Sequence, residues 1–109
     1  MKEGFVARAA ELAENSNLCF RHGAVVILGG KIVGEGFNYF DHHLNSRSIH
    51  AEQAALIDSF KSIKKKDLKK CTLLVVRINK SGNLCLSFPC SECHRLVRSY
   101  HLKSIVYSI

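Results

Sequence analysis

Two short segments, His-Ala-Glu at 50–52 and Pro-Cys-Ser-Glu-Cys at 89–93, carry side chains that are able to do chemistry together. We expect each segment to begin a helix, where unpaired N–H groups and a partial positive charge favour a thiolate over a thiol. The thiolates of Cys90 and Cys93, one turn apart, can bind one metal ion, and the imidazole of His50 makes a third ligand. Zinc accepts such a nitrogen–sulfur set, and three protein ligands leave the fourth position to water. The pattern therefore predicts a catalytic rather than a structural zinc site.

Glu52 follows His50 by two residues, so its side chain points in a different direction from the imidazole. We expect its carboxylate to face water at the metal rather than the metal itself. Zinc lowers the pKa of such a water toward neutrality, and a carboxylate within reach takes the proton and passes it to a ring nitrogen and a departing amine. These parts suit attack on an amidine-like carbon followed by loss of ammonia, which makes Glu52 the predicted catalytic residue.

The two motifs together, H-x-E followed by P-C-x-x-C, are the signature of zinc-dependent nucleobase deaminases. The sequence resembles the cytidine and deoxycytidylate deaminase superfamily along nearly its whole length, and residues 23–52 are also similar to tRNA adenosine deaminases. Gly-Ala-Val-Val at 23–26 and Gly-Glu-Gly-Phe-Asn at 34–38 add to the resemblance. It implies one deaminase domain over residues 1–109, with zinc as its cofactor. It also implies a homodimer or larger homo-oligomer.

The resemblance also implies which residues contact the substrate, a nucleoside, a nucleotide or a single-stranded nucleic acid. Asn38 matches the asparagine that holds the substrate sugar, and Ala24 matches the position where the first strand lines the base pocket. Ser87 and Phe88 match the backbone that receives the exocyclic amine.

The polar turn before Ser-Phe-Pro-Cys at 87–90 is more similar to cytidine deaminases than to the adenosine enzymes. We therefore predict conversion of cytosine to uracil, with adenosine to inosine on tRNA as the alternative.

An alternative of another class is a non-catalytic zinc module that binds nucleic acid or protein. Such a structural site needs four protein ligands. They would be drawn from Cys85, Cys90, Cys93 and either His94 or His101. In this hypothesis the Glu52 carboxylate has no function. Replacing Glu52 therefore distinguishes the two hypotheses, because only the enzyme should lose activity.

The elements that must position these residues follow from periodicity and turn signals. Helices are expected over 2–16, 50–63 and 89–100, and strands over 24–28, 31–36, 71–78 and 104–109, with a short return at 84–87. Gly29-Gly30 is a tight hairpin turn, and residues 38–48 are expected to form a loop. The order predicts an α/β fold, a three-layer α-β-α sandwich with a mixed sheet of four to five strands, like that of cytidine deaminases.

The composition limits the class of protein and the kinds of partner that the chain can have. The chain has 109 residues, of which 47% are hydrophobic, and a formal net charge of +7, which favours anionic partners such as nucleotides. Five cysteines, an odd number, indicate no disulfide framework. No apolar run is long enough to cross a bilayer and the start lacks a signal-peptide pattern, so we expect a soluble cytoplasmic protein with no membrane partner.

The densest basic block, six lysines between Lys61 and Lys70, follows the helix that His50 begins. Because that helix starts at the predicted zinc site, the lysines should lie on the order of 20 Å from the metal. At that distance they are able to hold a long polymer, but they cannot orient the reacting base directly.

Overall fold

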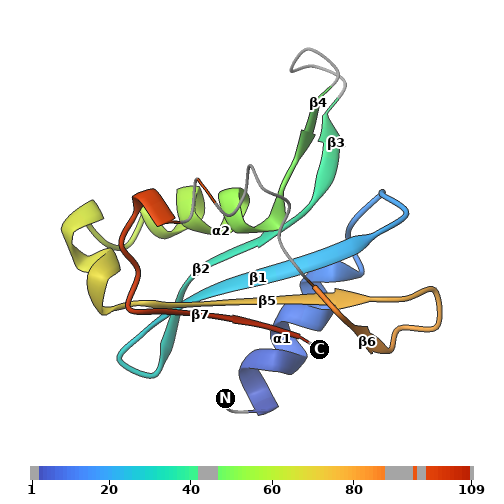
Figure 1. Cartoon of the computed structure of the whole chain (residues 1–109), viewed down its shortest axis with the longest axis horizontal. Coiled ribbons are helices and arrows are strands. Elements are labelled where there is room, and N and C mark those ends of the chain that lie inside the picture. Colours follow the sequence, from blue (N-terminus) through green and yellow to red (C-terminus); the bar gives the residue numbers. More distant parts are fainter. Residues whose placement is uncertain (1–2, 42–46, 88–94, 96–97, 109) are drawn as a thin grey trace.

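The computed structural model of the chain describes residues 3–41, 47–87, 95 and 98–108 (Figure 1). In chain order the elements are α1 (Glu3–Ala13), β1 (Arg21–Leu28), β2 (Lys31–Phe37), β3 (Tyr39–Asp41), β4 (Arg47–Ile49), α2 (Ala51–Ser59), the 3-10 helix η1 (Lys65–Lys70), β5 (Thr72–Ile78), β6 (Leu84–Cys85) and β7 (Ser104–Tyr107). The helix predicted over 89–100 lies mostly outside the described residues.

The main sheet is mixed and has five strands. β1 lies between β2 and β5 and is antiparallel to both, while β5 pairs with β7 in parallel and with β6 in antiparallel register. β7 pairs with the first half of β5 and β6 with its last two residues, so both lie along the same edge of β5. The predicted Gly29-Gly30 turn joins β1 to β2 with positive φ at both glycines.

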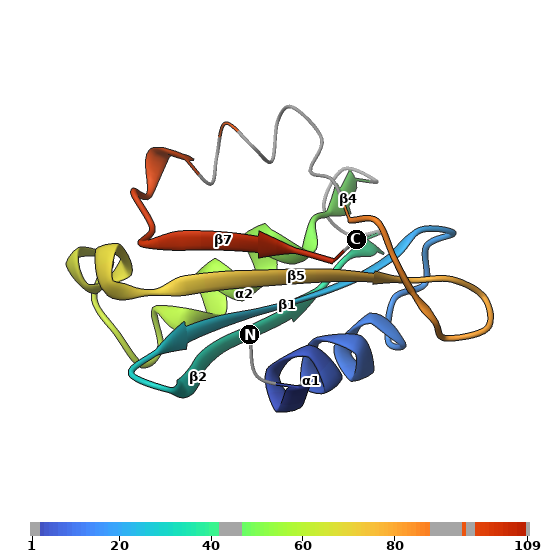
Figure 2. The same ribbon diagram turned by 60° about the horizontal axis from the view of Figure 1, so that its bottom comes forward.

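The two faces of the sheet are covered by different helices, as Figure 2 shows for α1 and α2. Along β1, Val25 and Ile27 pack with Ala9 and Leu12 of α1, whereas the alternate residues Ala24 and Val26 pack against α2. β5 alternates in the same way. This period-two pattern buries both faces. The predicted three-layer α-β-α sandwich is confirmed.

Helix α2 lies directly on β2 because two glycines of that strand leave room for it. A Cβ built on Gly36 would lie 2.7 Å from the Cβ of Ala54, closer than real Cβ contacts, and one on Gly34 would lie 2.7 Å from the Cβ of Ser59. The Asp58 carboxylate accepts a hydrogen bond from the backbone N–H of Glu35 at 2.9 Å. The two glycines and this hydrogen bond together set the position of α2 on β2.

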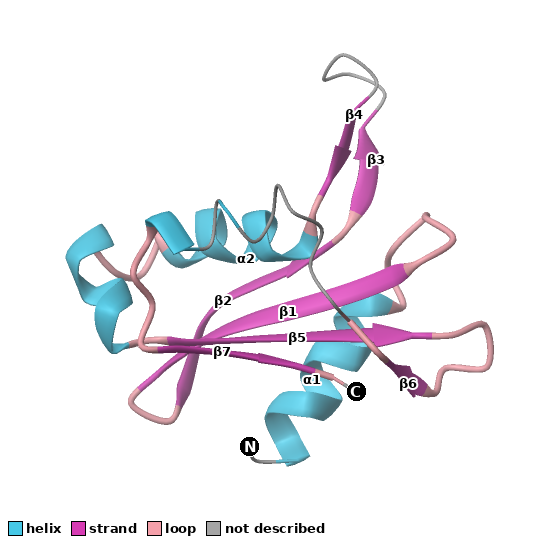
Figure 3. Ribbon diagram, viewed as in Figure 1, coloured by secondary structure: helices cyan, strands magenta, loops and turns pink. Residues whose placement is uncertain are grey.

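Two segments differ from the sequence-based expectation. Residues 38–48 were expected to be a loop, but β3 and β4 pair there as a separate two-stranded antiparallel ribbon, which stands beside the start of α2 in Figure 3. Strands of three residues are too short to show a period. Helix α2 also ends a turn earlier than predicted, at Ser59, whose hydroxyl donates to the carbonyl of Leu56 at 2.6 Å. Within the described part of the chain, no helix is long and apolar enough to cross a membrane.

The packing of α2 on β2 can be tested by replacing Gly36 with alanine. The added methyl group meets the backbone of α2, and overpacking of this kind costs about 1–3 kcal/mol in the free energy of unfolding. The matched control is Gly4→Ala in α1, where a Cβ meets nothing within 4 Å. That change should be neutral or should stabilise the helix by up to about 1 kcal/mol. Urea denaturation measures both, and equal stabilities for the two variants would contradict the packing.

Candidate active site

The start of α2 brings two of the predicted site residues together. His50 is the N-cap residue, with an extended backbone, and its half-buried side chain makes no capping hydrogen bond to the helix. Glu52 lies in the first turn and is only 5% exposed. No hydrogen bond joins its carboxylate to another residue in the described part of the chain. A carboxylate that is shielded from bulk solvent at the start of a helix is suited to exchange protons with a group bound beside it.

His22, at the start of β1, is a neighbour of this pair that the sequence analysis did not single out as catalytic. It alternates with Ala24 and Val26, so its side chain lies on the face that α2 covers. Burial lowers the pKa of His22, and the Phe20 carbonyl and Glu52 oppose that shift, while Arg77 and His50 add to it. The imidazole is therefore neutral at pH 7 and lies close enough to Glu52 and His50 to interact with both.

Asn38, directly after β2, is 8% exposed and ties the end of that strand to the start of β1. Its side-chain amide donates to the carbonyl of Phe20 at 2.6 Å, and its side-chain oxygen accepts the backbone N–H of His22 at 2.8 Å. Its own backbone N–H donates to the carbonyl of His22 at 3.2 Å. Asn38 thus acts as a buried clamp, by which we mean that its three hydrogen bonds to the backbone of Phe20 and His22 hold the end of β2 against the start of β1.

Ala24 and Ser87 lie one strand apart near the same end of the sheet. Ala24 is fully buried, packs in one cluster with Ala51, and is the register partner of Val75 on β5. The hydroxyl of Ser87 donates to the carbonyl of Val75 at 3.0 Å, and its backbone N–H donates to the carbonyl of Ser108 at 2.9 Å. Both positions are therefore held at Val75 of β5, and Ala24 also packs with Ala51 at the start of α2.

Three predicted site residues, Cys90, Cys93 and Phe88, lie outside the described residues. No group of three or more metal-binding side chains is found among the residues that are described. The residues of the proposed site nevertheless suit zinc. An imidazole and two thiols are ligands that zinc accepts, and the buried carboxylate of Glu52 suits a proton-bearing group beside them.

Arg77 is a second residue of this region that the sequence analysis missed. It faces His22 across the β1–β5 pair, and directly opposite residues of an antiparallel pair point to the same face. One signal was available, because Arg77 is the only charged residue in the strand Thr72–Ile78, whose other residues are mostly buried. That Arg77 lies opposite His22 depends on the register between β1 and β5, which the local sequence does not predict.

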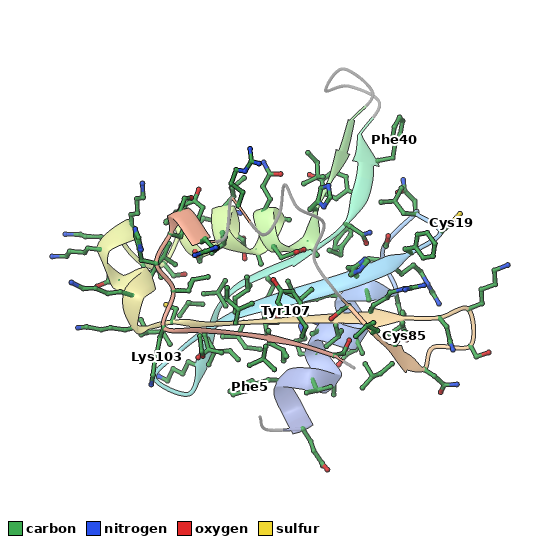
Figure 4. All side chains as sticks on the ribbon, in the orientation of Figure 1. Phe5, Cys19, Phe40, Cys85, Lys103 and Tyr107 are labelled. Carbon is green, nitrogen blue, oxygen red and sulfur yellow. The ribbon has the colours of Figure 1, made fainter. Side chains whose placement is uncertain are left out.

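The lysine block lies at the far end of α2 from His50, as predicted. Figure 1 shows η1 at the end of the molecule opposite the β3–β4 ribbon. The buried side chain of Leu68 anchors η1 to the core, and the lysines around it are exposed. Figure 4 shows Phe40 projecting from the ribbon at the other end.

The chain is thus an α/β sandwich in which half-buried His50 and buried Glu52 lie together at the start of the second helix. A family model described as the cytidine and deoxycytidylate deaminase zinc-binding region matches residues 1–109. The chain belongs to this deaminase family. A search of curated protein sequences finds no match.

Solved structures of deaminases share the fold. The dCMP deaminase of cyanophage S-TIM5 is 24% identical with a TM-score of 0.66, and the alignment covers 98% of this chain and 84% of that one. Guanine deaminase of Bacillus subtilis is 23% identical with a TM-score of 0.71, and the shares covered are 98% and 64%.

A third similar structure is the diaminohydroxyphosphoribosylaminopyrimidine deaminase/5-amino-6-(5-phosphoribosylamino)uracil reductase of Thermotoga maritima. It is 29% identical with a TM-score of 0.66, and the alignment covers 96% of this chain and 28% of that one. The chain thus spans only a small part of that protein. The predicted membership of the cytidine deaminase superfamily is confirmed.

The clamp formed by Asn38 predicts a large effect of Asn38→Ala on stability. The variant leaves the buried N–H of His22 without its partner, which costs about 1–3 kcal/mol in the free energy of unfolding. The matched control is Asn17→Ala, which removes an exposed side-chain bond to the N–H of Phe40 and should cost less than about 1 kcal/mol. Urea denaturation of both variants makes the comparison. Equal losses would show that Asn38 is not a structural clamp.

Proposed function

We propose that the chain is a zinc-dependent hydrolase that deaminates a nucleobase, converting cytosine to uracil and releasing ammonia. The observation that carries the proposal is the Glu52 carboxylate, 5% exposed and close to His22 and His50, in a chain of the deaminase family. A purely structural zinc module gives a carboxylate at this shielded position, two residues from a metal-binding imidazole, no task. A carboxylate so placed is suited to move protons at a bound group, which favours a catalytic role.

The residues that would hold zinc in this proposal are His50, Cys90 and Cys93. The family description, a zinc-binding region, supports the metal. Zinc held by these residues would supply a hydroxide nucleophile at neutral pH, because the metal lowers the pKa of water that it binds.

Glu52 moves the protons in this proposal. Its carboxylate accepts a proton from the attacking water and delivers it to the ring nitrogen N3 of cytosine. The second proton of the water goes to the exocyclic amine, the C4–N bond breaks, and ammonia leaves. The oxygen of the water remains on the ring as the carbonyl of uracil. His22 stays neutral beside Glu52, so it adds no positive charge that would weaken the carboxylate as a base.

Cytosine is favoured over adenine by the segment that follows β5. A turn and the short strand β6 separate β5 from Ser87 and the cysteine pair, an arrangement similar to that of cytidine deaminases. The similar cyanophage enzyme is a dCMP deaminase whose structure was solved with dCMP and dUMP, which supports a pyrimidine substrate here.

The other proposed contacts are with the base and the sugar. Ala24 and Ser87 lie on either side of Val75 of β5 and would line the base pocket together with Phe88. Asn38 would hold the sugar through the second acceptor site of its side-chain oxygen, which accepts one hydrogen bond from the backbone of His22. Its amide nitrogen already contacts the Phe20 carbonyl at 2.6 Å and Nδ1 of His22 at 3.4 Å. Self-association is also part of the proposal, and light scattering at micromolar concentration tests it.

Replacing Glu52 by glutamine tests the proposed function. The variant should fold and bind zinc as the wild type does, but its turnover should fall by about 10²–10⁴-fold, since the amide cannot carry protons. The control is Glu14→Gln, which removes an exposed carboxylate and should leave turnover unchanged. Ammonia release and product chromatography on cytidine, deoxycytidine, dCMP, single-stranded DNA, tRNA and guanine measure the activity.

The outcomes separate the hypotheses. Uracil products that vanish in the Glu52→Gln variant support the proposal, whereas inosine or xanthine as the sole product overturns the choice of cytosine. A wild-type protein that holds zinc but releases no ammonia from any substrate contradicts the enzyme and favours the non-catalytic module.

A further inference from the structure

A hollow of about 280 Å³ lies at the end of the sheet where β1 begins and β5 ends. The described residues that line it are Phe20, His22, Arg77 and Leu86. His22 connects the hollow to the proposed active site, because it alternates along β1 with Ala24 and Val26 and so lies on the sheet face that α2 covers. The other three residues have no part in the proposed deamination, so the hollow is a space beside the reacting base rather than the base pocket itself.

Arg77 presents a guanidinium group with unused hydrogen-bonding capacity. Its Nε atom is buried and has no hydrogen-bond partner among the described residues, and none of the ion pairs found there involves it. The contrast with Arg8 is direct, since the carboxylate of Glu35 accepts two bonds from that guanidinium, at 2.6 and 3.0 Å. A buried donor left without a partner costs free energy unless a ligand supplies an acceptor.

The position of the Arg77 guanidinium is fixed by Phe20. The guanidinium carbon lies 4.5 Å from the centre of the phenyl ring, in cation–π contact, although Phe20 itself is 61% exposed. Leu86, 47% exposed, lies on the same hollow. Two large apolar side chains thus remain at the surface beside a cation, an arrangement that hydrophobic burial alone does not favour.

The chemistry of the hollow suits a phosphate group. A planar guanidinium donates paired hydrogen bonds to phosphate oxygens, and stacking on an aromatic ring holds that plane in place. A carboxylate ligand would meet the same donors, but a nucleobase substrate carries its negative charge on phosphate. The guanidinium of Arg77 is the permanently charged group among the described residues that line the hollow.

We propose that Arg77, positioned by Phe20, binds a phosphate of the substrate, so that the chain acts on a nucleotide unit in preference to a free base or nucleoside. This inference rests on the proposed function and deepens it. The phosphate has two possible sources with the same chemistry, the 5′-phosphate of a mononucleotide and the phosphodiester of a single strand.

The test compares kcat/KM for deoxycytidine, dCMP and a short single-stranded oligodeoxynucleotide that contains one cytosine and no terminal phosphate. The wild type should prefer a phosphate-bearing substrate to deoxycytidine by about 10- to 100-fold, the worth of a charged hydrogen bond. Arg77→Gln should lose that preference while keeping its activity on deoxycytidine. Phe20→Leu, at an exposed position, should lower the preference by about two- to fivefold.

The matched control is Lys31→Gln, which removes one positive charge at the opposite end of β1, beside the Gly29-Gly30 turn. It should leave the preference unchanged. A preference for dCMP identifies the mononucleotide as the source, and a preference for the oligonucleotide alone identifies the phosphodiester. Equal activity on all three substrates, or a preference that survives Arg77→Gln, overturns the subsite and leaves the proposed function intact.

A binding measurement keeps the two proposals separate if no substrate is turned over. Calorimetric titration of the zinc-loaded Glu52→Gln chain compares dCMP with deoxycytidine. Tighter binding of dCMP that disappears in the Glu52→Gln, Arg77→Gln double variant supports the phosphate subsite, even where the proposed deamination has failed. Equal binding of dCMP and deoxycytidine overturns the subsite independently of any activity.

Discussion

The burial of the Glu52 carboxylate is the constraint on which the rest of the site depends. A carboxylate at 5% exposure is expensive to keep in a folded protein unless its surroundings supply a partner for it. The packing of α2 places it there, since Gly34 and Gly36 let the helix lie directly on β2 and Asp58 binds the backbone of that strand. The helix–strand contact therefore fixes the position of Glu52 in the proposed acid–base site.

The register of the sheet then gathers the remaining residues at one end of the molecule. Antiparallel pairing of β1 with β5 sets the start of one strand beside the end of the other, so that His22 faces Arg77 and Ala24 faces Val75. Ser87 returns to this place through its hydrogen bond to the Val75 carbonyl. Strand pairing thus brings residues that are far apart in the sequence to the same end of the sheet.

Much of this architecture could be predicted from the sequence, because it rests on local patterns. The apolar period of α1, the Gly29-Gly30 turn and the buried run of β5 each indicate their element directly. His50 and Glu52 could be predicted as a pair because their chemistry depends on spacing within one helix.

The remaining features arise from contacts between distant segments. The pairing of β3 with β4 involves three residues from each strand, too few for a periodic signal. The positions of His22 and Arg77 beside the site depend on the β1–β5 register, and the commitment of Asn38 to the backbone of Phe20 and His22 depends on where β2 ends. Pairwise register of this kind is a property of the folded sheet rather than of any local stretch of sequence.

The proposed function depends on a zinc ion at the start of α2 that keeps one position open for water beside Glu52. X-ray absorption spectroscopy of the zinc-loaded chain tests this most directly. We predict one zinc per chain with two sulfur ligands at about 2.3 Å and two lighter ligands, nitrogen and oxygen, at about 2.0 Å. The lighter oxygen ligand should exchange with added azide or thiocyanate. A zinc site with a third sulfur or a second imidazole that ignores added anions, or a chain that binds no zinc, would contradict the account.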